Sequence, residues 1–206
     1  MRIVALAGAL ETTARGRARP DVESLYDLTV TQYGKPRSLG EYKGKVVVVA
    51  NKYRSRGLEF IAFPVNQFGC QGPGTSEMER EYAYKKFGTR DFEVMDKIAV
   101  KTKPVRCKGI DPKSYEEFKD DPDAMLTAPL VDDVTSSAKE SPVYEFLKRK
   151  PFDKEIEWNY VKFLVGRDGQ VLRRYSPGDP LEQGMEEDIK RALDGRELGK
   201  PRNPYA

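Results

Sequence analysis

The sequence has no histidine, a single tryptophan, and only two cysteines, Cys70 and Cys107, in 206 residues. Without an imidazole, no Ser/His or Cys/His pair can activate a nucleophile, and no Cys/His zinc site can form. Two cysteines are too few for the disulfide framework of a small secreted scaffold. The composition therefore excludes imidazole-dependent catalysis, Cys/His metal centres and a disulfide framework.

The sequence also lacks a surplus of one charge and any long apolar run. Its 36 basic and 33 acidic residues are mixed along the chain and give a formal net charge of +3. No concentrated basic field is available to neutralise phosphates, so nucleic acid is not an expected partner. The apolar stretch 3–10 is too short to span a bilayer, and no later stretch approaches a membrane span. A chain of 23.4 kDa is long enough for one core, which predicts a single folded domain.

The ends of the chain differ in composition from its middle. Residues 1–20 combine the apolar stretch with several arginines, a pattern shared by disordered leaders and targeting peptides. We expect a leader over residues 1–23, a domain over 24–198 and a tail over 199–206. The expected location is cytoplasmic, with a mitochondrial or plastid leader as the alternative.

Alternating and continuous apolar patterns predict the strands. Residues 25–30 alternate as a half-buried strand does, and Gly34 marks the turn of an N-terminal hairpin. Residues 46–50 and 58–63 are continuously apolar, as in central parallel strands covered on both faces. Asp168-Gly169, between two further alternating runs over 160–175, predicts a second hairpin.

Capping residues and helical periodicity predict the helices. Thr75 or Ser76 can cap a helix that Gly88 ends, and Ser141-Pro142 opens another through Leu147. Residues 99–132, rich in Lys, Asp, Pro and Gly, indicate an insertion with a short helical segment at 114–119. A last helix is predicted from the spacing of Leu181, Met185, Ile189 and Leu193, with Gly195 placed to end it. The element order predicts an α/β fold.

Two motifs carry a family resemblance. Residues 63–75 read FPVNQFGCQGPGT, and residues 158–165 read WNYVKFLV. Both resemble motifs of the glutathione peroxidase family, and the resemblance extends over about residues 24–193. It implies a thioredoxin-like sandwich with an N-terminal hairpin, and an enzyme that reduces hydrogen peroxide and organic or lipid hydroperoxides with glutathione or thioredoxin. A hydroperoxide and a thiol reductant are the implied partners, without a bound cofactor or metal, in a monomer or homo-oligomer.

The resemblance also implies three site residues. A thiol peroxidase attacks the peroxide O–O bond with a thiolate that hydrogen-bond donors stabilise. In the family these donors are a Gln, a Trp and an Asn, which match Gln71, Trp158 and Asn159. Each also has a structural interpretation: Gln71 as a turn brace, Trp158 as a core aromatic, and Asn159 as a side chain bonded to its own backbone.

The family's reactive residue is the feature that this sequence does not supply. Relatives carry the peroxidatic Cys or Sec and a helix directly after a strand like 46–50, whereas only residues 51–57 separate the two strands here, with the missing segment expected between Ala50 and Lys52. Parallel neighbours usually need a crossover of a dozen or more residues. We therefore expect the strands to pair differently or the sheet to be incomplete, as in a spliced product or a faulty gene model, with residues 46–50 as an uncovered edge.

The two cysteines do not replace that residue in the family pattern. Cys70 is interpreted as a turn residue with an idle thiol, and otherwise as a weak substitute nucleophile. Cys107, in the insertion, is interpreted as an inert loop thiol. Val65 stands where many relatives have Cys, and Tyr84 stands where relatives that recycle through an internal disulfide have their resolving Cys. Lys52, Arg54 and Arg56 would attract glutathione carboxylates or form a solvated surface.

Three hypotheses follow for this chain. The first is a glutathione-peroxidase-like protein with little or no peroxidase activity, because the donors would surround an absent sulfur. The second is a non-enzymatic module that binds glutathione or a partner through the retained surface. The third is the truncated product, for which exposed apolar surface and aggregation are expected.

Overall fold

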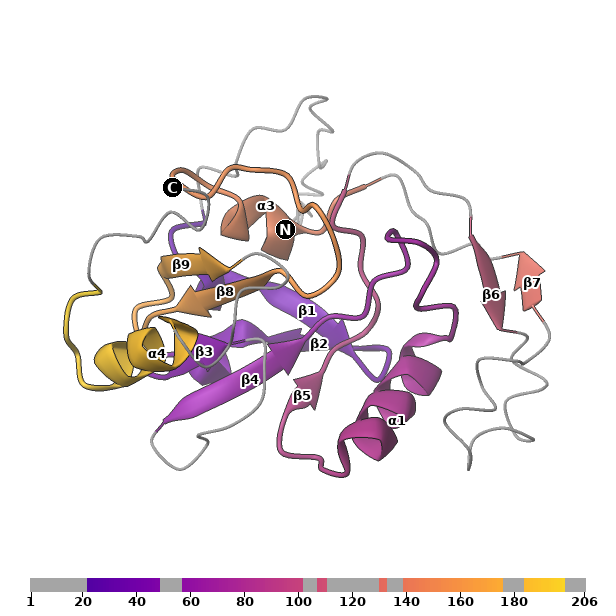
Figure 1. The fold of residues 1–206 in the computed structure, drawn as a ribbon, viewed down its shortest axis with the longest axis horizontal. Coiled ribbons are helices and arrows are strands. Elements are labelled where there is room, and N and C mark those ends of the chain that lie inside the picture. The colour runs from indigo at the N-terminus through magenta and orange to yellow at the C-terminus, as the bar shows by residue number, and fades with distance from the viewer. Residues whose placement is uncertain are drawn as a thin grey trace, which may run out of the picture.

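The computed structural model describes residues 22–48, 57–101, 107–110, 130–132, 139–175 and 184–198. Figure 1 shows these elements in one α/β arrangement around a central sheet. In chain order they are η1 (Leu25–Asp27), β1 (Thr29–Gln32), β2 (Lys35–Ser38), η2 (Leu39–Tyr42), β3 (Val46–Val48), β4 (Leu58–Ala62), α1 (Ser76–Phe87), β5 (Glu93–Val94), β6 (Lys108–Ile110), β7 (Leu130–Asp132), α3 (Pro142–Leu147), β8 (Lys162–Val165), β9 (Val171–Tyr175) and α4 (Glu186–Leu193).

The central sheet has five strands in the order β5-β4-β3-β8-β9. β4 runs parallel to β3 and β5, while β8 is antiparallel to β3 and to β9. Residues along β3 alternate between two apolar clusters, Val47 on one side and Val46 and Val48 on the other. The first cluster includes α3 and η1, and the second includes α4 and Tyr84 of α1. Covering on both faces explains why the central strands read as continuous apolar runs.

β3 and β4 correct one expectation from the sequence. They are parallel neighbours, with Val46 opposite Leu58, although only residues 49–57 connect them. A parallel connection must span the length of the strand, which is about 10 Å for three residues. Nine residues can reach about 30 Å, so the connection is long enough for strands this short. The prediction that the strands pair differently or leave the sheet incomplete was wrong. β3 lies between β4 and β8, so the expected uncovered edge is also absent from the described sheet.

The N-terminal hairpin forms, but it begins later than predicted. Residues 25–27 form the 3-10 helix η1 rather than a strand, because the Ser24 hydroxyl accepts from Tyr26 N–H at 3.1 Å and Asp27 accepts from Ser24 N–H at 2.8 Å. The hairpin itself pairs β1 with β2. Tyr33 and Gly34 form its turn with φ values of 53° and 69°, the positive φ values of a tight hairpin turn.

The other described elements follow the sequence patterns. Thr75 caps α1 by accepting from Met78 N–H, and Gly88 ends it with a φ of 63°. Ser141 caps α3, and β8 pairs with β9 across the Asp168-Gly169 turn. In the predicted insertion, β6 pairs with β7, while the helical segment predicted at 114–119 lies outside the described residues. So does Leu181 at the start of the predicted last helix, whose described part is α4.

Candidate functional site

The loop between β4 and α1 is held in place by two buried amide side chains. Asn66 Oδ1 accepts from Gly72 N–H at 3.0 Å. Gln67 Oε1 accepts from the backbone N–H of Val100 at 2.7 Å and of Lys101 at 3.0 Å. Both residues belong to the motif over residues 63–75, but the family resemblance identified only Gln71 there as a site residue. Because these buried amides accept hydrogen bonds from backbone N–H groups, they fix the loop. Gly69 and Gln71 in the turn after them are exposed to solvent.

Lys97 and Glu79 support the same loop from the α1 side. The Lys97 ammonium donates to the carbonyl oxygens of Gly72 at 2.8 Å and Gly74 at 2.7 Å. The Glu79 carboxylate accepts from Gly74 N–H at 2.7 Å, and burial raises its pKa, opposed by that hydrogen bond and by Lys97. The segment from Gly72 to Gly74 is therefore anchored through its own backbone.

Replacing Glu79 with glutamine gives a pH-dependent prediction. The folded protein binds the Glu79 proton more tightly than the unfolded chain does, so its contribution to stability is fully present below the unfolded pKa. That contribution is lost as pH rises through the raised folded pKa. We expect the unfolding free energy of wild type relative to Glu79→Gln to fall with rising pH, measured by urea denaturation from acidic to neutral pH. A difference that stays constant over this range would contradict the prediction.

Gln71, Trp158 and Asn159 lie together. Asn159 Nδ2 donates to Gln71 Oε1 at 2.8 Å across 88 residues of sequence. The Trp158 ring lies 5.9 Å from the Phe68 ring, and a Cβ placed on Gly69 would lie 3.5 Å from Trp158 and 3.6 Å from Gln71. The turn reaches these positions with positive φ at Gly69 and Cys70.

The structural interpretations of the three residues differ from this arrangement. Trp158 is 47% exposed and is therefore not a core aromatic. The Asn159 side chain bonds Gln71 rather than its own backbone, and Gln71 is exposed. Tyr160, which the sequence did not single out, is 77% exposed beside them, and the Lys101 ammonium lies 4.0 Å from the Phe68 ring centroid. The result is an open surface with aromatic rings, two amides and a cation; the role of the amides and the indole at a reactive sulfur stays a prediction.

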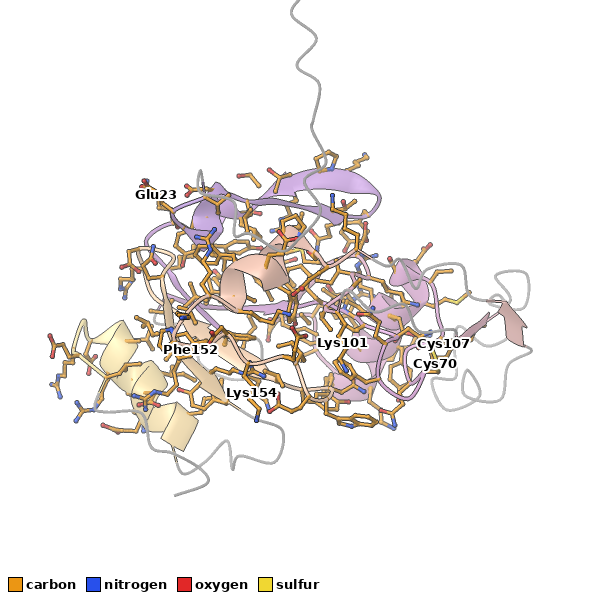
Figure 2. All side chains as sticks on the ribbon, turned by 90° about the horizontal axis from the view of Figure 1, so that it is seen from above. Glu23, Cys70, Lys101, Cys107, Phe152 and Lys154 are labelled. Atoms are coloured by element: carbon orange, nitrogen blue, oxygen red, sulfur yellow. A yellow bond between two sulfur atoms is a disulfide. The ribbon has the colours of Figure 1, made fainter. Side chains whose placement is uncertain are left out.

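The two cysteines form a disulfide, which corrects the interpretation of both. Cys70 and Cys107 are joined, with their Cα atoms 5.4 Å apart (Figure 2). Cys70 is thus not an idle thiol, and Cys107 is not an isolated loop thiol; the cysteine count was taken to exclude a disulfide framework, and the sequence did not predict this single bond. Two cysteines suffice for one pair when the fold brings them together. Here Ile110 N–H donates to Pro73 O at 2.8 Å and places β6 beside the turn.

The remaining candidate positions have structural surroundings or lie outside the described residues. Tyr84 is buried in the core, with its ring 5.4 Å from that of Phe92. Val65 packs against the other apolar cluster. Lys52, Arg54, Arg56 and the expected gap between Ala50 and Lys52 lie outside the described residues.

The described residues contain neither a metal-binding cluster nor a membrane-crossing helix. No group of three or more Cys, Asp or Glu side chains there is placed to hold a metal ion. Among the described helices, none has the length and apolar character that crossing a membrane requires.

The α/β sheet brings Gln71, Trp158 and Asn159 together at one loop cluster, as the resemblance to a thioredoxin-like peroxidase family predicts, and comparisons with known proteins agree. A family model described as glutathione peroxidase matches residues 38–105. A probable phospholipid hydroperoxide glutathione peroxidase 6, mitochondrial, of Arabidopsis thaliana is 31% identical over 201 residues, covering 85% of this chain and 70% of that protein. Probable glutathione peroxidase 2 of the same plant is 33% identical, covering 83% and 94%. The chain therefore belongs to the glutathione peroxidase family.

Solved structures support the fold. The crystal structure of T. cruzi GPX1 matches with a TM-score of 0.50 at 23% identity, covering 84% of this chain and 97% of that one. The crystal structure of Trgpx in apo form matches with a TM-score of 0.52 at 22% identity, covering 86% and 100%. The predicted thioredoxin-like α/β fold is confirmed.

Proposed function

We propose that this chain is a glutathione-peroxidase-like protein of hydroperoxide metabolism whose own peroxidase turnover is strongly reduced. The family reaction is reduction of hydrogen peroxide or organic and lipid hydroperoxides by glutathione or thioredoxin, in the response to oxidative stress. The observation that carries the reduced turnover is the direct bond between Asn159 and Gln71, at 2.8 Å. An N–H of the Asn159 amide, which would otherwise stabilise a thiolate, is instead donated to Gln71.

The state of the cysteines supports the same proposal. Thiol peroxidases need a thiolate, because the nucleophile must carry the electron pair that attacks the O–O bond. The sequence has two cysteines, and the structure joins them to each other. In this oxidised state neither sulfur can serve as the nucleophile. The relatives named for phospholipid hydroperoxides support a lipid hydroperoxide as the substrate class of the proposed ancestral reaction.

A peroxidase assay tests this proposal. The oxidised protein is incubated with hydrogen peroxide, cumene hydroperoxide or a phospholipid hydroperoxide, with glutathione or a thioredoxin system as the reductant. We expect consumption close to the rate without protein, and no further change in Gln71→Ala or Asn159→Ala. Consumption that is fast, and that reduction and alkylation of the protein beforehand abolish, would overturn the proposal.

A non-enzymatic binding role is the second candidate, and the exposed aromatic surface favours it. Trp158 and Tyr160 present large rings to solvent, the Asn159 and Gln71 amides are bonded to each other, and the Lys101 ammonium lies over Phe68, the ring beside Trp158. Such a surface suits a thiol peptide such as glutathione, whose carboxylates would meet the cation. Saturable quenching of Trp158 emission by glutathione, without turnover, is the outcome that distinguishes this role.

We also propose that residues 1–23 act as an organellar leader. The relative named mitochondrial supports this alternative to a cytoplasmic location. Hydroperoxide and a thiol reductant remain the proposed partners, with no bound cofactor.

A further inference from the structure

The Cys70–Cys107 disulfide lies at the edge of the surface that contains Gln71 and Trp158. Cys70 directly precedes Gln71, and Gly69 on its other side is the position against which Trp158 packs. Both cysteines are partly exposed. Figure 2 shows the bond on the side of the molecule where β6 and β7 extend from the body. A disulfide in this position is open to attack by an external thiolate.

The sulfur of Cys107 contacts a backbone carbonyl. Cys107 Sγ lies 3.1 Å from the carbonyl oxygen of Asn66, whose side chain is itself fixed by Gly72 N–H. A thiol at this position donates its S–H to the carbonyl, whereas a thiolate there would face the partial negative charge of the oxygen. Reduction therefore leaves the proton on Cys107.

We propose that Cys70–Cys107 is an exchangeable disulfide that accepts two electrons from an external dithiol, with Cys70 as the leaving sulfur. The inference goes beyond the proposed hydroperoxide chemistry and does not depend on it. The carbonyl at Cys107 disfavours a thiolate there, so Cys70 is the better leaving group. The external thiolate therefore attacks Cys107, the sulfur opposite the leaving group.

The exchange proceeds in two steps. The thiolate of the dithiol attacks Cys107 Sγ, the bond between the protein sulfurs breaks, and Cys70 leaves as a thiolate. The second thiol of the reductant then attacks the reductant sulfur that is bonded to Cys107 in the mixed disulfide. The bond to Cys107 breaks, and Cys107 takes the proton that this thiol loses. The products are the reduced protein and the cyclic disulfide of the reductant.

Reduction changes how β6 is attached to the turn. In the oxidised protein the covalent bond and the hydrogen bond from Ile110 N–H to Pro73 O both join them. Exchange removes the covalent link beside Gln71 and leaves the hydrogen bond. The redox state of the pair thus acts on the loop that presents the candidate site.

A redox titration of the whole oxidised chain tests the exchange. The protein is equilibrated with increasing dithiothreitol, alkylated with iodoacetamide and weighed by mass spectrometry, while circular dichroism follows the fold. We expect two alkyl groups to be added with the dichroism unchanged, and a change in emission from the single tryptophan, Trp158. A pair that stays oxidised until denaturant unfolds the protein would overturn the proposal, because the bond would then be a structural staple.

Two single-cysteine variants test the direction of the exchange. Cys107→Ser retains Cys70 as its single thiol, and Cys70→Ser retains Cys107 as its single thiol. At neutral pH we expect iodoacetamide to react about threefold faster with Cys107→Ser than with Cys70→Ser. The Cys70 thiol should have an about tenfold larger thiolate fraction, and the lower nucleophilicity of a thiolate of lower pKa reduces this advantage to about threefold. Equal rates in the folded variants, or the reverse order, would overturn the assignment; equal rates in denaturant are the control. Neither assay contains a hydroperoxide, so failure of the proposed peroxidase function leaves both outcomes unaffected.

Discussion

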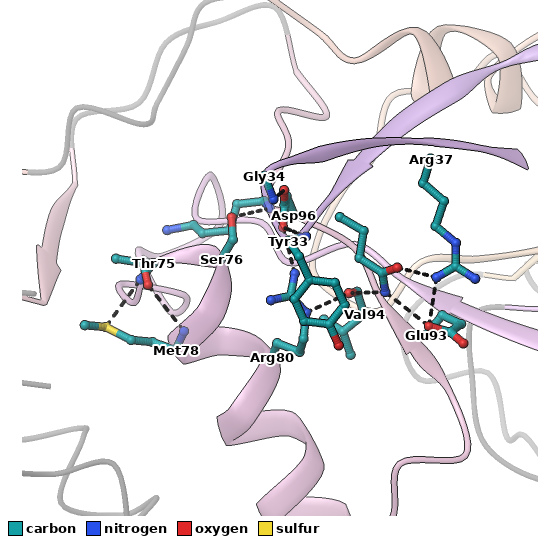
Figure 3. Close-up of polar contacts among 12 residues, drawn as sticks. Tyr33, Gly34, Arg37, Thr75, Ser76, Met78, Arg80, Glu93, Val94 and Asp96 are labelled. Atoms are coloured by element: carbon teal, nitrogen blue, oxygen red, sulfur yellow. Dashed lines mark hydrogen bonds and ion pairs between the residues drawn. The ribbon is translucent and has the colours of Figure 1, made fainter. Parts of the chain in front are cut away.

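Replacing Arg80 with methionine is expected to destabilise the protein by about 3 kcal/mol, because it leaves a mostly buried carboxylate without its counter-ion. Arg80 is 2% exposed, and its guanidinium donates to Asp96 Oδ1 at 2.7 Å and to Val94 O at 3.0 Å. It also lies 4.1 Å from the ring centroid of Tyr33. Figure 3 shows that this arginine joins α1 to β5 and to the N-terminal hairpin. Urea denaturation of the wild type and the variant measures the loss.

Arg90→Met is the matched control for this prediction. Arg90 also pairs with a carboxylate, Glu81 at 2.7 Å, and also lies over a tyrosine ring, but its side chain is 64% exposed. Solvent screens such a pair, so the midpoint of unfolding should not change. Equal effects of Arg80→Met and Arg90→Met would contradict the assignment of Arg80 as a buried structural cation. A further variant, Arg80→Met with Asp96→Asn, should recover part of the loss because the unpaired charge is removed.

The Arg80 network also affects the position of the site. Asp96 accepts from the backbone N–H groups of Tyr33 and Gly34, at 3.1 and 3.0 Å. The next residue, Lys97, donates its backbone N–H to Ser76 and its ammonium to the carbonyls of the site loop. The segment after β5 thus connects the hairpin, the start of α1 and the loop that precedes it. Rigid second-layer support of this kind fixes the geometry of a surface site.

The sequence predicted those helices and turns whose boundaries are set by neighbouring residues. The Thr75 cap and the Gly88 terminus define α1, and Asp168-Gly169 defines the turn between β8 and β9. The proximity of Gln71 to Trp158 and Asn159 was also predicted, from motif resemblance. Each of these predictions needed only neighbouring residues or an inherited pattern.

Interactions between distant segments account for what the sequence did not predict. Arg80 would be expected at the surface, since arginine is rarely fully buried without a partner, and its partner Asp96 lies 16 residues away. The Cys70–Cys107 bond spans 37 residues and depends on β6 docking beside Pro73. The parallel pairing of β3 and β4 depends on how short those strands are, which a run of apolar residues does not reveal.

Replacing Gly169 with alanine is expected to destabilise the protein by about 3 kcal/mol or more, from a strained backbone and an overpacked contact together. Gly169 has a φ of 81°. A Cβ there would lie 1.9 Å from Ser24 Oγ, 2.8 Å from Tyr26 Cδ2 and 3.2 Å from Leu25 N. Ser24 cannot easily turn away, because its hydroxyl donates to Asp168 O at 2.9 Å and accepts from Tyr26 N–H. The measurement is the unfolding free energy in urea.

Gly44→Ala separates the two causes of this loss. Gly44 has nearly the same φ, 83°, but a Cβ there would meet nothing within 4 Å. Its substitution should cost only the backbone strain, about 1–2 kcal/mol. The difference between the two variants then measures the contact between the β8–β9 turn and η1, where Leu25 N–H donates to Gly169 O at 3.1 Å. If both variants lose the same stability, the turn does not pack against η1 as tightly as these distances require.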